Sequence, residues 1–189
     1  RRFAKEIHKN SSRLLTLIND IIRLSELDAS AVSHTFEPIN LHSIAETCVN
    51  MRQINAEKHN VTLTFDGTPA EVMSTKEMME ELVYNLCDNA IRYNNEYGTV
   101  HVSLKEEANK VVLSVKDTGI GIPKDHQERV FERFYRVDKS RSKSTGGTGL
   151  GLAIVKHIVV QSNAEIELYS EKGFGTEIKI IFPKIEAKD

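Results

Sequence analysis

Glycine is concentrated around one polar segment of this chain. Six of the ten glycines lie at positions 119, 121, 146, 147, 149 and 151, and the last four run into a predicted helix over residues 150–161. A glycine-rich loop that enters a helix N-terminus offers backbone N–H groups and the positive end of the helix dipole to an anion. The pattern indicates a phosphate site, but a flexible loop without a ligand would have the same composition.

Two common glycine motifs do not fit this context. A dinucleotide-binding fingerprint follows directly on a strand, whereas residues 136–145 are polar and charged. A Walker A motif needs Lys and then Ser or Thr after its last glycine, whereas Gly151 is followed by Leu152 and Ala153. Protein-kinase signature motifs are absent from the sequence as well.

A row of polar residues marks one face of another predicted helix. Asn85 and Asn89 are four residues apart, Glu81 lies one turn earlier, and Arg92 or Tyr93 one turn later. Asparagine is a poor helix former, so two in register suggest a function. Amide oxygens suit Mg²⁺, which takes few protein ligands together with phosphate oxygens. A plain solvated helix face is the alternative.

Asp117 is a further candidate, because it follows a predicted strand and precedes the glycines at 119 and 121. A carboxylate in that position could accept a hydrogen bond from an amino group of a ligand. It could equally cap a tight turn through its own backbone.

Hydrophobic periodicity predicts the elements that must position these residues. Helices are expected over residues 3–28, 41–59, 74–93 and 150–161, with Asn40 as a helix N-cap, and strands over residues 36–39, 61–65, 72–73, 99–104, 110–115, 164–169 and 176–182. Strands and helices mix without strict βαβ alternation. This favours an α/β two-layer sandwich, a mixed sheet with helices on one face, preceded by a long amphipathic helix.

The first helix carries an apolar stripe that includes Ile7, Leu14 and Ile21. A stripe of that length needs a partner, either its own domain or other helices of a bundle, and we favour a bundle. A polar hinge at 28–34 would then divide the chain into a helical segment, 1–30, and a domain, 35–189.

Composition sets limits on the function. The formal net charge of −2 gives no support for nucleic-acid or membrane-surface binding. Cys48 and Cys87 have no CxxC spacing, which is typical of reduced, buried thiols. No apolar run is long enough to cross a bilayer. The chain starts without Met inside a predicted helix, so we expect a fragment of a longer protein, with a membrane segment possible upstream.

Taken together, the motifs resemble the catalytic domain of sensor histidine kinases. The N, G1, F, G2 and terminal glycine boxes of that family match, in order, Asn85 to Asn89, Asp117 to Gly121, Phe131 to Arg136, Gly147 to Gly151 and Gly173 to Thr176. The resemblance covers essentially the whole chain, since residues 13–25 are similar to the second helix of the family's dimerization hairpin.

The resemblance implies a Bergerat-type α/β sandwich that binds ATP and Mg²⁺. Asn85 would coordinate Mg²⁺, Asp117 would accept the adenine amino hydrogen, and Glu81 would share the catalytic role of Asn85. A basic lid would cover the nucleotide from about residue 124 to 148. The nucleotide-binding residues implied are Asn85, Asn89, Arg92, Tyr93, Asp117, Gly119, Gly121, Ile122, Tyr135, Arg136, Gly147, Thr148, Gly149, Leu150, Gly151, Leu152 and Thr176.

The implied reaction is transfer of the γ-phosphoryl group of ATP to a histidine and then to an aspartate of a response-regulator receiver domain. The full protein would dimerize through a helical bundle, and this part of a membrane-anchored sensor would be cytoplasmic. The family's acceptor box, Ser-His-Glu/Asp-Leu-Arg-x-Pro, matches none of the seven histidines, so the acceptor is expected upstream. Ser162 and Asn163 also depart from the family's His-Gly-Gly. Alternatives are another ATPase of the same fold or a non-catalytic binding module.

Overall fold

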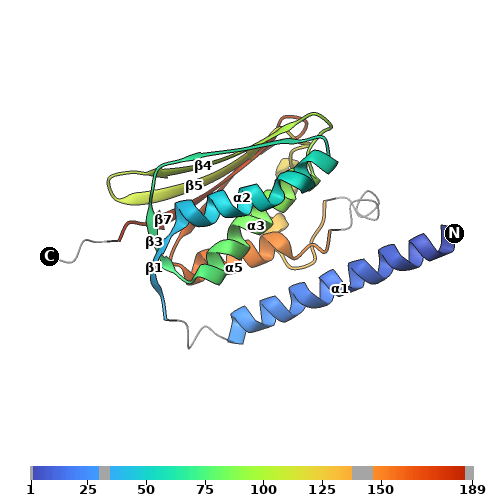
Figure 1. Cartoon of the computed structure of the whole chain (residues 1–189), viewed down its shortest axis with the longest axis horizontal. Coiled ribbons are helices and arrows are strands. Elements are labelled where there is room, and N and C mark those ends of the chain that lie inside the picture. The colour runs from blue at the N-terminus through green and yellow to red at the C-terminus, as the bar shows by residue number, and fades with distance from the viewer. Residues whose placement is uncertain (1, 30–34, 138–146, 186–189) are drawn as a thin grey trace.

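The computed structural model describes residues 2–29, 35–137 and 147–185. Its main layer is a five-stranded mixed sheet in the order β2-β4-β5-β7-β6, and the helices α2, α3 and α5 cover one face of that sheet (Figure 1). The helices of this layer are α2 (Leu41–Lys58), α3 (Lys76–Arg92) and α5 (Gly151–Gln161), and the strands are β2 (Thr62–Gly67), β4 (Thr99–Glu106), β5 (Lys110–Asp117), β6 (Glu165–Glu171) and β7 (Gly175–Pro183). The predicted two-layer sandwich is confirmed.

The sheet alternates in the way that a half-covered sheet requires. In β4, Val100, Val102 and Leu104 are completely buried, while His101 faces solvent. Strand β4 pairs parallel with β2 and antiparallel with β5, with Val102 opposite Val115. Because side chains alternate with period two, this register places all the apolar side chains of the strand on the face that the helices cover.

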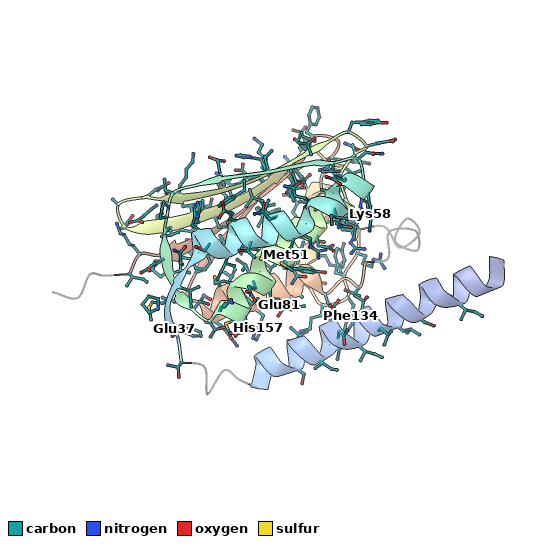
Figure 2. All side chains as sticks on the ribbon, in the orientation of Figure 1. Glu37, Met51, Lys58, Glu81, Phe134 and His157 are labelled. Atoms are coloured by element: carbon teal, nitrogen blue, oxygen red, sulfur yellow. The ribbon has the colours of Figure 1, made fainter. Side chains whose placement is uncertain are left out.

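The hydrophobic core lies between that sheet face and the helices, whose side chains fill the space between the layers (Figure 2). Leu82 and Leu86 of α3 and Ile154 and Ile158 of α5 are at most 2% exposed. The four-residue spacing in each helix produces one apolar stripe. Both helices pack this stripe on the sheet, and their other faces point away from it.

Helices α2 and α3 each begin directly after a residue whose side chain caps the helix N-terminus. The side chain of Asn40 accepts a hydrogen bond from the Ser43 N–H at the start of α2, as predicted, and the side chain of Thr75 accepts one from Met78 at the start of α3. A two-stranded antiparallel sheet, β1 (Glu37–Asn40) with β3 (Glu71–Ser74), leads into both helices.

A few boundaries differ from the prediction. Strand β2 continues through Asp66 to Gly67, where a turn was expected, because it stays paired with β4 as far as Leu104. Asn163 follows α5 with a φ of 50°, a left-handed conformation that asparagine adopts more readily than most residues other than glycine. The departure from glycine at this position therefore leaves the turn intact.

Helix α1 (Arg2–Ala29) runs along one side of the domain and packs partly on α5 (Figure 1). Leu24 is only 5% exposed, and Leu17 is half-buried against the core. Other apolar residues of the stripe remain between 44% and 62% exposed, namely Ile7, Leu14, Leu15, Ile18, Ile21 and Ile22. Most of the stripe thus has no partner within the described residues. The division into 1–30 and 35–189 stays a prediction, and residues 30–34 of the expected hinge lie outside the described part.

Among the described residues, no helix is both long and apolar enough to span a bilayer.

Candidate functional site

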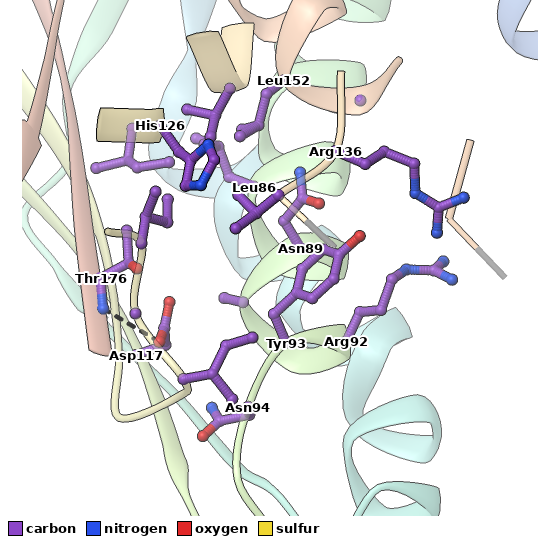
Figure 3. Close-up of a pocket in the computed structure, with 18 of the residues that line it drawn as sticks. Leu86, Asn89, Arg92, Tyr93, Asn94, Asp117, His126, Arg136, Leu152 and Thr176 are labelled. Atoms are coloured by element: carbon purple, nitrogen blue, oxygen red, sulfur yellow. Dashed lines mark hydrogen bonds between the residues drawn. The ribbon is translucent and has the colours of Figure 1, made fainter. Parts of the chain in front are cut away.

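A cavity of about 710 Å³ opens between α3, the start of α5 and the end of the sheet where Asp117 lies (Figure 3). Of the residues predicted to bind the nucleotide, those that line it are Asn89, Arg92, Tyr93, Asp117, Gly121, Ile122, Tyr135, Arg136, Gly149, Gly151, Leu152 and Thr176. Most of the predicted set therefore surrounds one hollow, although its members come from segments far apart in the sequence.

Asp117 lies at the end of β5, at the sheet side of the cavity. Its Oδ1 accepts hydrogen bonds from the N–H of Gly119 at 2.8 Å and from the N–H of Thr176 at 3.2 Å (Figure 3). Burial raises the pKa of Asp117 to about 6, although the two backbone N–H groups act to lower it. The contacts described use one carboxylate oxygen, so the site offers a desolvated acceptor of the kind that binds an amino group.

Gly121 shows why the turn after Asp117 requires glycine. Its φ is 63°, and a Cβ at this position would lie 1.9 Å from the carbonyl oxygen of Glu171. The backbone of 119–122 is therefore packed against the β6–β7 turn, with Ile122 N–H donating to Ser170 Oγ at 2.8 Å. This packing shapes the wall of the cavity beside Asp117.

The start of α5 meets the asparagine row of α3. A Cβ on Gly151 would lie 2.9 Å from Asn85 Oδ1 and 3.4 Å from Asn89 Nδ2. The first turn of α5 has no side-chain cap and no acidic residue. Its first N–H groups and the positive end of its dipole are therefore available to an anion, and they lie beside the two amides.

The amide of Asn85 is oriented by its own helix, because Nδ2 donates to the carbonyl of Glu81 at 2.9 Å. This hydrogen bond leaves Oδ1 on the side of Gly151. The described residues include no group of three or more His, Cys, Asp or Glu side chains that could hold a metal. An amide oxygen such as Asn85 Oδ1 fits a cation that takes most of its ligands from phosphate and water.

Cationic side chains gather at the end of the cavity away from Asp117. Figure 3 shows the guanidinium groups of Arg92 and Arg136 on the same side, with the Tyr93 ring between them and Asp117. A Cβ on Gly147 would lie 3.0 Å from Tyr93 Oη and 3.7 Å from Arg136 Nη2. The glycine loop therefore approaches this cationic end closely.

The described part of the expected lid forms a wall of the cavity. Two 3₁₀ turns, η2 (Lys124–His126) and η3 (Arg129–Phe131), precede Tyr135, whose hydroxyl contacts His126 Nδ1. The Phe134 N–H donates to the carbonyl of Gly149 at 2.9 Å, which joins this segment to the glycine loop. Phe134 itself is 56% exposed, on the side of the domain where α1 runs (Figure 2). Residues 138–146 of the expected lid lie outside the described part.

Several predicted residues do not line the cavity. Gly119 supports Asp117, Leu150 is fully buried in the core, and the hydroxyl of Thr148 donates to Asp20 of α1 at 2.6 Å. The full set outside the lining is Glu81, Asn85, Gly119, Gly147, Thr148 and Leu150. These residues surround the site and shape it, and the backbone of residues 147–150 leads directly into the start of α5.

The residues that the sequence did not predict are the apolar wall of the cavity and three polar neighbours. The missed lining residues are Leu86, Ala90, Asn94, Val115, Ile120, Pro123, His126, Val130, Val137, Lys172 and Ile178. Leu86 and Ala90 belong both to the hydrophobic core and to the cavity wall. No local pattern distinguishes His126 or Lys172 from ordinary surface residues.

Comparisons with known proteins show the family of the chain. The family described as histidine kinase-, DNA gyrase B- and HSP90-like ATPase matches residues 74–186. The sensor-like histidine kinase SenX3 of Mycolicibacterium smegmatis is 38% identical over 185 residues, which are 97% of this chain and 48% of that protein. The sensor histidine kinase WalK of Bacillus subtilis is 33% identical and is matched over 31% of its length. The chain thus spans about half, or less, of these relatives.

Solved structures show the same fold. The mycobacterial sensor histidine kinase MprB superposes with a TM-score of 0.68 at 26% identity, over 79% of this chain and 98% of that one. Full-length ShkA in complex with AMPPNP superposes with a TM-score of 0.81 at 23% identity, over the whole of this chain and 40% of that one. The chain therefore belongs to the histidine kinase-, DNA gyrase B- and HSP90-like ATPase family, as an ATP-binding catalytic domain of the sensor histidine kinase type.

Proposed function

We propose that this domain binds Mg²⁺·ATP in the cavity and delivers the γ-phosphoryl group to a histidine outside this sequence. The observation that carries the proposal is the polarity of the cavity. A half-buried acceptor, Asp117, lies at one end, and two guanidinium groups with an uncapped helix start lie at the other. An adenine amino group and a triphosphate match these two ends in a single ligand.

The adenine would lie at the sheet end of the cavity. Asp117 would accept its amino hydrogen through Oδ2, while Gly119 and Thr176 hold Oδ1, and Gly121 and Ile122 would lie beside the ring. Val115 and Ile178 lie opposite each other on the strands that carry Asp117 and Thr176, and both line the cavity. Their apolar surface excludes water from this end, which strengthens a hydrogen bond to the carboxylate.

The phosphates would lie at the opposite end. Arg92, Tyr93 and Arg136 would contact them from α3 and the lid, and the backbone from Gly147 to Gly151 would donate N–H groups at the start of α5. Mg²⁺ would bind Asn85 Oδ1 and phosphate oxygens, and Asn89 would stand beside it. Mg²⁺ would neutralise charge on the transferred group, while the protein positions it. Glu81 and Asn85 would form the catalytic pair. The backbone carbonyl of Glu81 accepts a hydrogen bond from the Asn85 side chain and so orients it.

The relatives are named sensor histidine kinases, and these names support a proposal for the acceptor and the partners. We propose that the phosphoryl group passes from the acceptor histidine to a receiver-domain aspartate, and that the exposed stripe of α1 pairs with other helices in a homodimer. In the same scheme this domain is the cytoplasmic part of a membrane-anchored sensor, which fractionation of the full-length protein tests.

The test separates binding from transfer. Calorimetry should show ATP binding to this chain, and radiolabelled ATP should leave it unlabelled, since no acceptor box is present. Addition of a fragment that carries the acceptor box should give acid-labile label on that fragment and none on its His→Gln control. Acid-labile label on this chain alone, at a rate like that of the combined system, would show that the acceptor is misplaced. Failure to bind ATP would refute the site.

A further inference from the structure

Asp88 is a carboxylate of α3 that the proposed function leaves without a role. It lies one turn before Arg92, and its Oδ2 accepts hydrogen bonds from Arg92 Nη2 at 2.6 Å and from Arg92 Nε at 3.2 Å. The two side chains are 20% and 26% exposed. Both donors of one edge of the guanidinium are thus engaged by a single oxygen, which fixes the plane of the group that stands at the cationic end of the cavity (Figure 3).

The other oxygen of Asp88 faces a second arginine, from a different helix. Arg52 of α2 places Nη2 3.6 Å from Asp88 Oδ1, and its guanidinium lies over the Tyr84 ring at 3.6 Å from the ring centroid. Its side chain is 15% exposed. Within the described part of the chain, Nε and Nη2 of Arg52 are buried without a hydrogen-bond partner. A desolvated cation with so few partners depends on an anion beside it, and Asp88 forms an ion pair with it.

Alternating charges therefore connect the surface of α2 to the cavity. Arg52 attracts Asp88 from one side, and Asp88 holds Arg92 from the other. Arg52, Asp88 and Tyr84 do not line the cavity, and the hydrogen bonds of Asp88 join them to it through Arg92. An isolated i,i+4 pair on a helix surface contributes little, because solvent and side-chain entropy weaken it. Here Arg52 and the Tyr84 ring hold the Asp88 side chain in one position. Asp88 can therefore fix the orientation of Arg92 instead of moving with it.

We propose that Asp88 is a positioning residue, anchored by Arg52 and the Tyr84 ring, that holds Arg92 in place for the nucleotide phosphates. The proposal rests on the proposed function, since it requires phosphates at the Arg92 end. It implies that the contribution of Arg92 to phosphate binding depends on Asp88. A carboxylate that merely offset the charge of Arg92 would have the opposite effect, because its removal would strengthen phosphate binding.

The experiment compares ATP with adenosine by calorimetry on the 189-residue chain. Asp88→Asn should lower ATP affinity about tenfold, about 1.4 kcal/mol, and leave adenosine affinity within about twofold. Arg92→Ala should lower ATP affinity as well, and Asp88→Asn added to Arg92→Ala should cause no further loss. Losses that add, an ATP affinity that rises in Asp88→Asn, or an equal loss for adenosine would each overturn the proposal.

A companion variant separates positioning from folding. Asp88→Asn leaves Arg52 buried without an anion, which alone can destabilise the domain. In Arg52→Met/Asp88→Asn the buried cation is gone as well, and Met can pack on the Tyr84 ring. In this double variant we expect the melting temperature to return towards the wild-type value while ATP affinity stays low. If ATP affinity returned as well, Asp88 would have a structural role only, and the positioning proposal would be refuted. A wild-type chain that binds adenosine but not ATP would refute the phosphate site itself, and unchanged ATP binding in Asp88→Asn would refute this inference alone.

Discussion

Replacement of Asp117 by Asn tests how the cavity recognises its base. In the wild type, the Gly119 and Thr176 N–H groups both donate to Oδ1, which leaves Oδ2 to accept a ligand N–H. The carbonyl oxygen of Asn can keep the two backbone donors, and its Nδ2 amide would then occupy the place of Oδ2. An acceptor is exchanged for a donor at that point, with almost no change in shape.

The effect on nucleotide selection follows from this exchange. The adenine amino group would face an N–H donor in Asp117→Asn, and a mismatch of this kind costs about 1–3 kcal/mol, so ATP affinity should fall roughly 5- to 150-fold. ITP carries a carbonyl in place of that amino group, so its affinity relative to ATP should rise in the variant. Calorimetry of both nucleotides gives the ratio. An unchanged ATP-to-ITP ratio would refute the assignment of Asp117 to the base.

The Asp117→Asn variant should lose ATP affinity but gain stability at neutral pH. The folded-state pKa of Asp117 is raised from the ordinary 3.8 to about 6, so the folded protein holds this proton more tightly than the unfolded chain does. The free energy of unfolding therefore falls as pH rises from about 4 through about 6, by about 3 kcal/mol in the limit. Asn does not ionise. The advantage of Asp117→Asn over wild type in urea unfolding should thus grow by about 2 kcal/mol between about pH 4.5 and about pH 7.5.

A matched control is Asp66→Asn, which changes an exposed carboxylate on the outer face of β2. It should leave the ATP-to-ITP ratio unchanged. A stability difference between Asp117→Asn and wild type that is independent of pH would show that the pKa of Asp117 is not raised in the folded protein.

Three further variants or measurements test other parts of the site. Asn85→Ala should reduce ATP affinity in Mg²⁺ to the value measured with EDTA, with little change in the apo melting temperature, and equal Mg²⁺ dependence would contradict metal binding at Asn85. Amides over 124–148 should exchange hydrogen quickly in the apo domain and slowly with a non-hydrolysable ATP analogue, and equal protection in both states would exclude a lid. Asp20→Asn keeps an acceptor for the Thr148 hydroxyl but removes a negative charge that acts electrostatically on Arg92. It should raise ATP affinity about two- to fivefold, less so at high salt, and a salt-independent effect would contradict the reasoning.

Local pattern determined much of this protein. The 3.6-residue period of α3 places Asn85 and Asn89 on one face and Leu82 and Leu86 on another, so the asparagine row could be identified without coordinates. The place of Asp117 at a strand end and the run of glycines into α5 are likewise local features. Such features depend on residues within a few positions of each other, which is why the order of the motifs was enough to predict the fold and the family.

Tertiary structure decided what lies beyond the reach of local pattern. Asp117 accepts from Thr176, 59 residues later, and burial by distant elements raises its pKa. Arg52 meets Asp88 only because α2 and α3 pack together, and Thr148 meets Asp20 across 128 residues. Contacts of this kind depend on strand register, helix packing and the path of the chain between elements. Each of them combines many weak preferences, and no single stretch of sequence specifies the result.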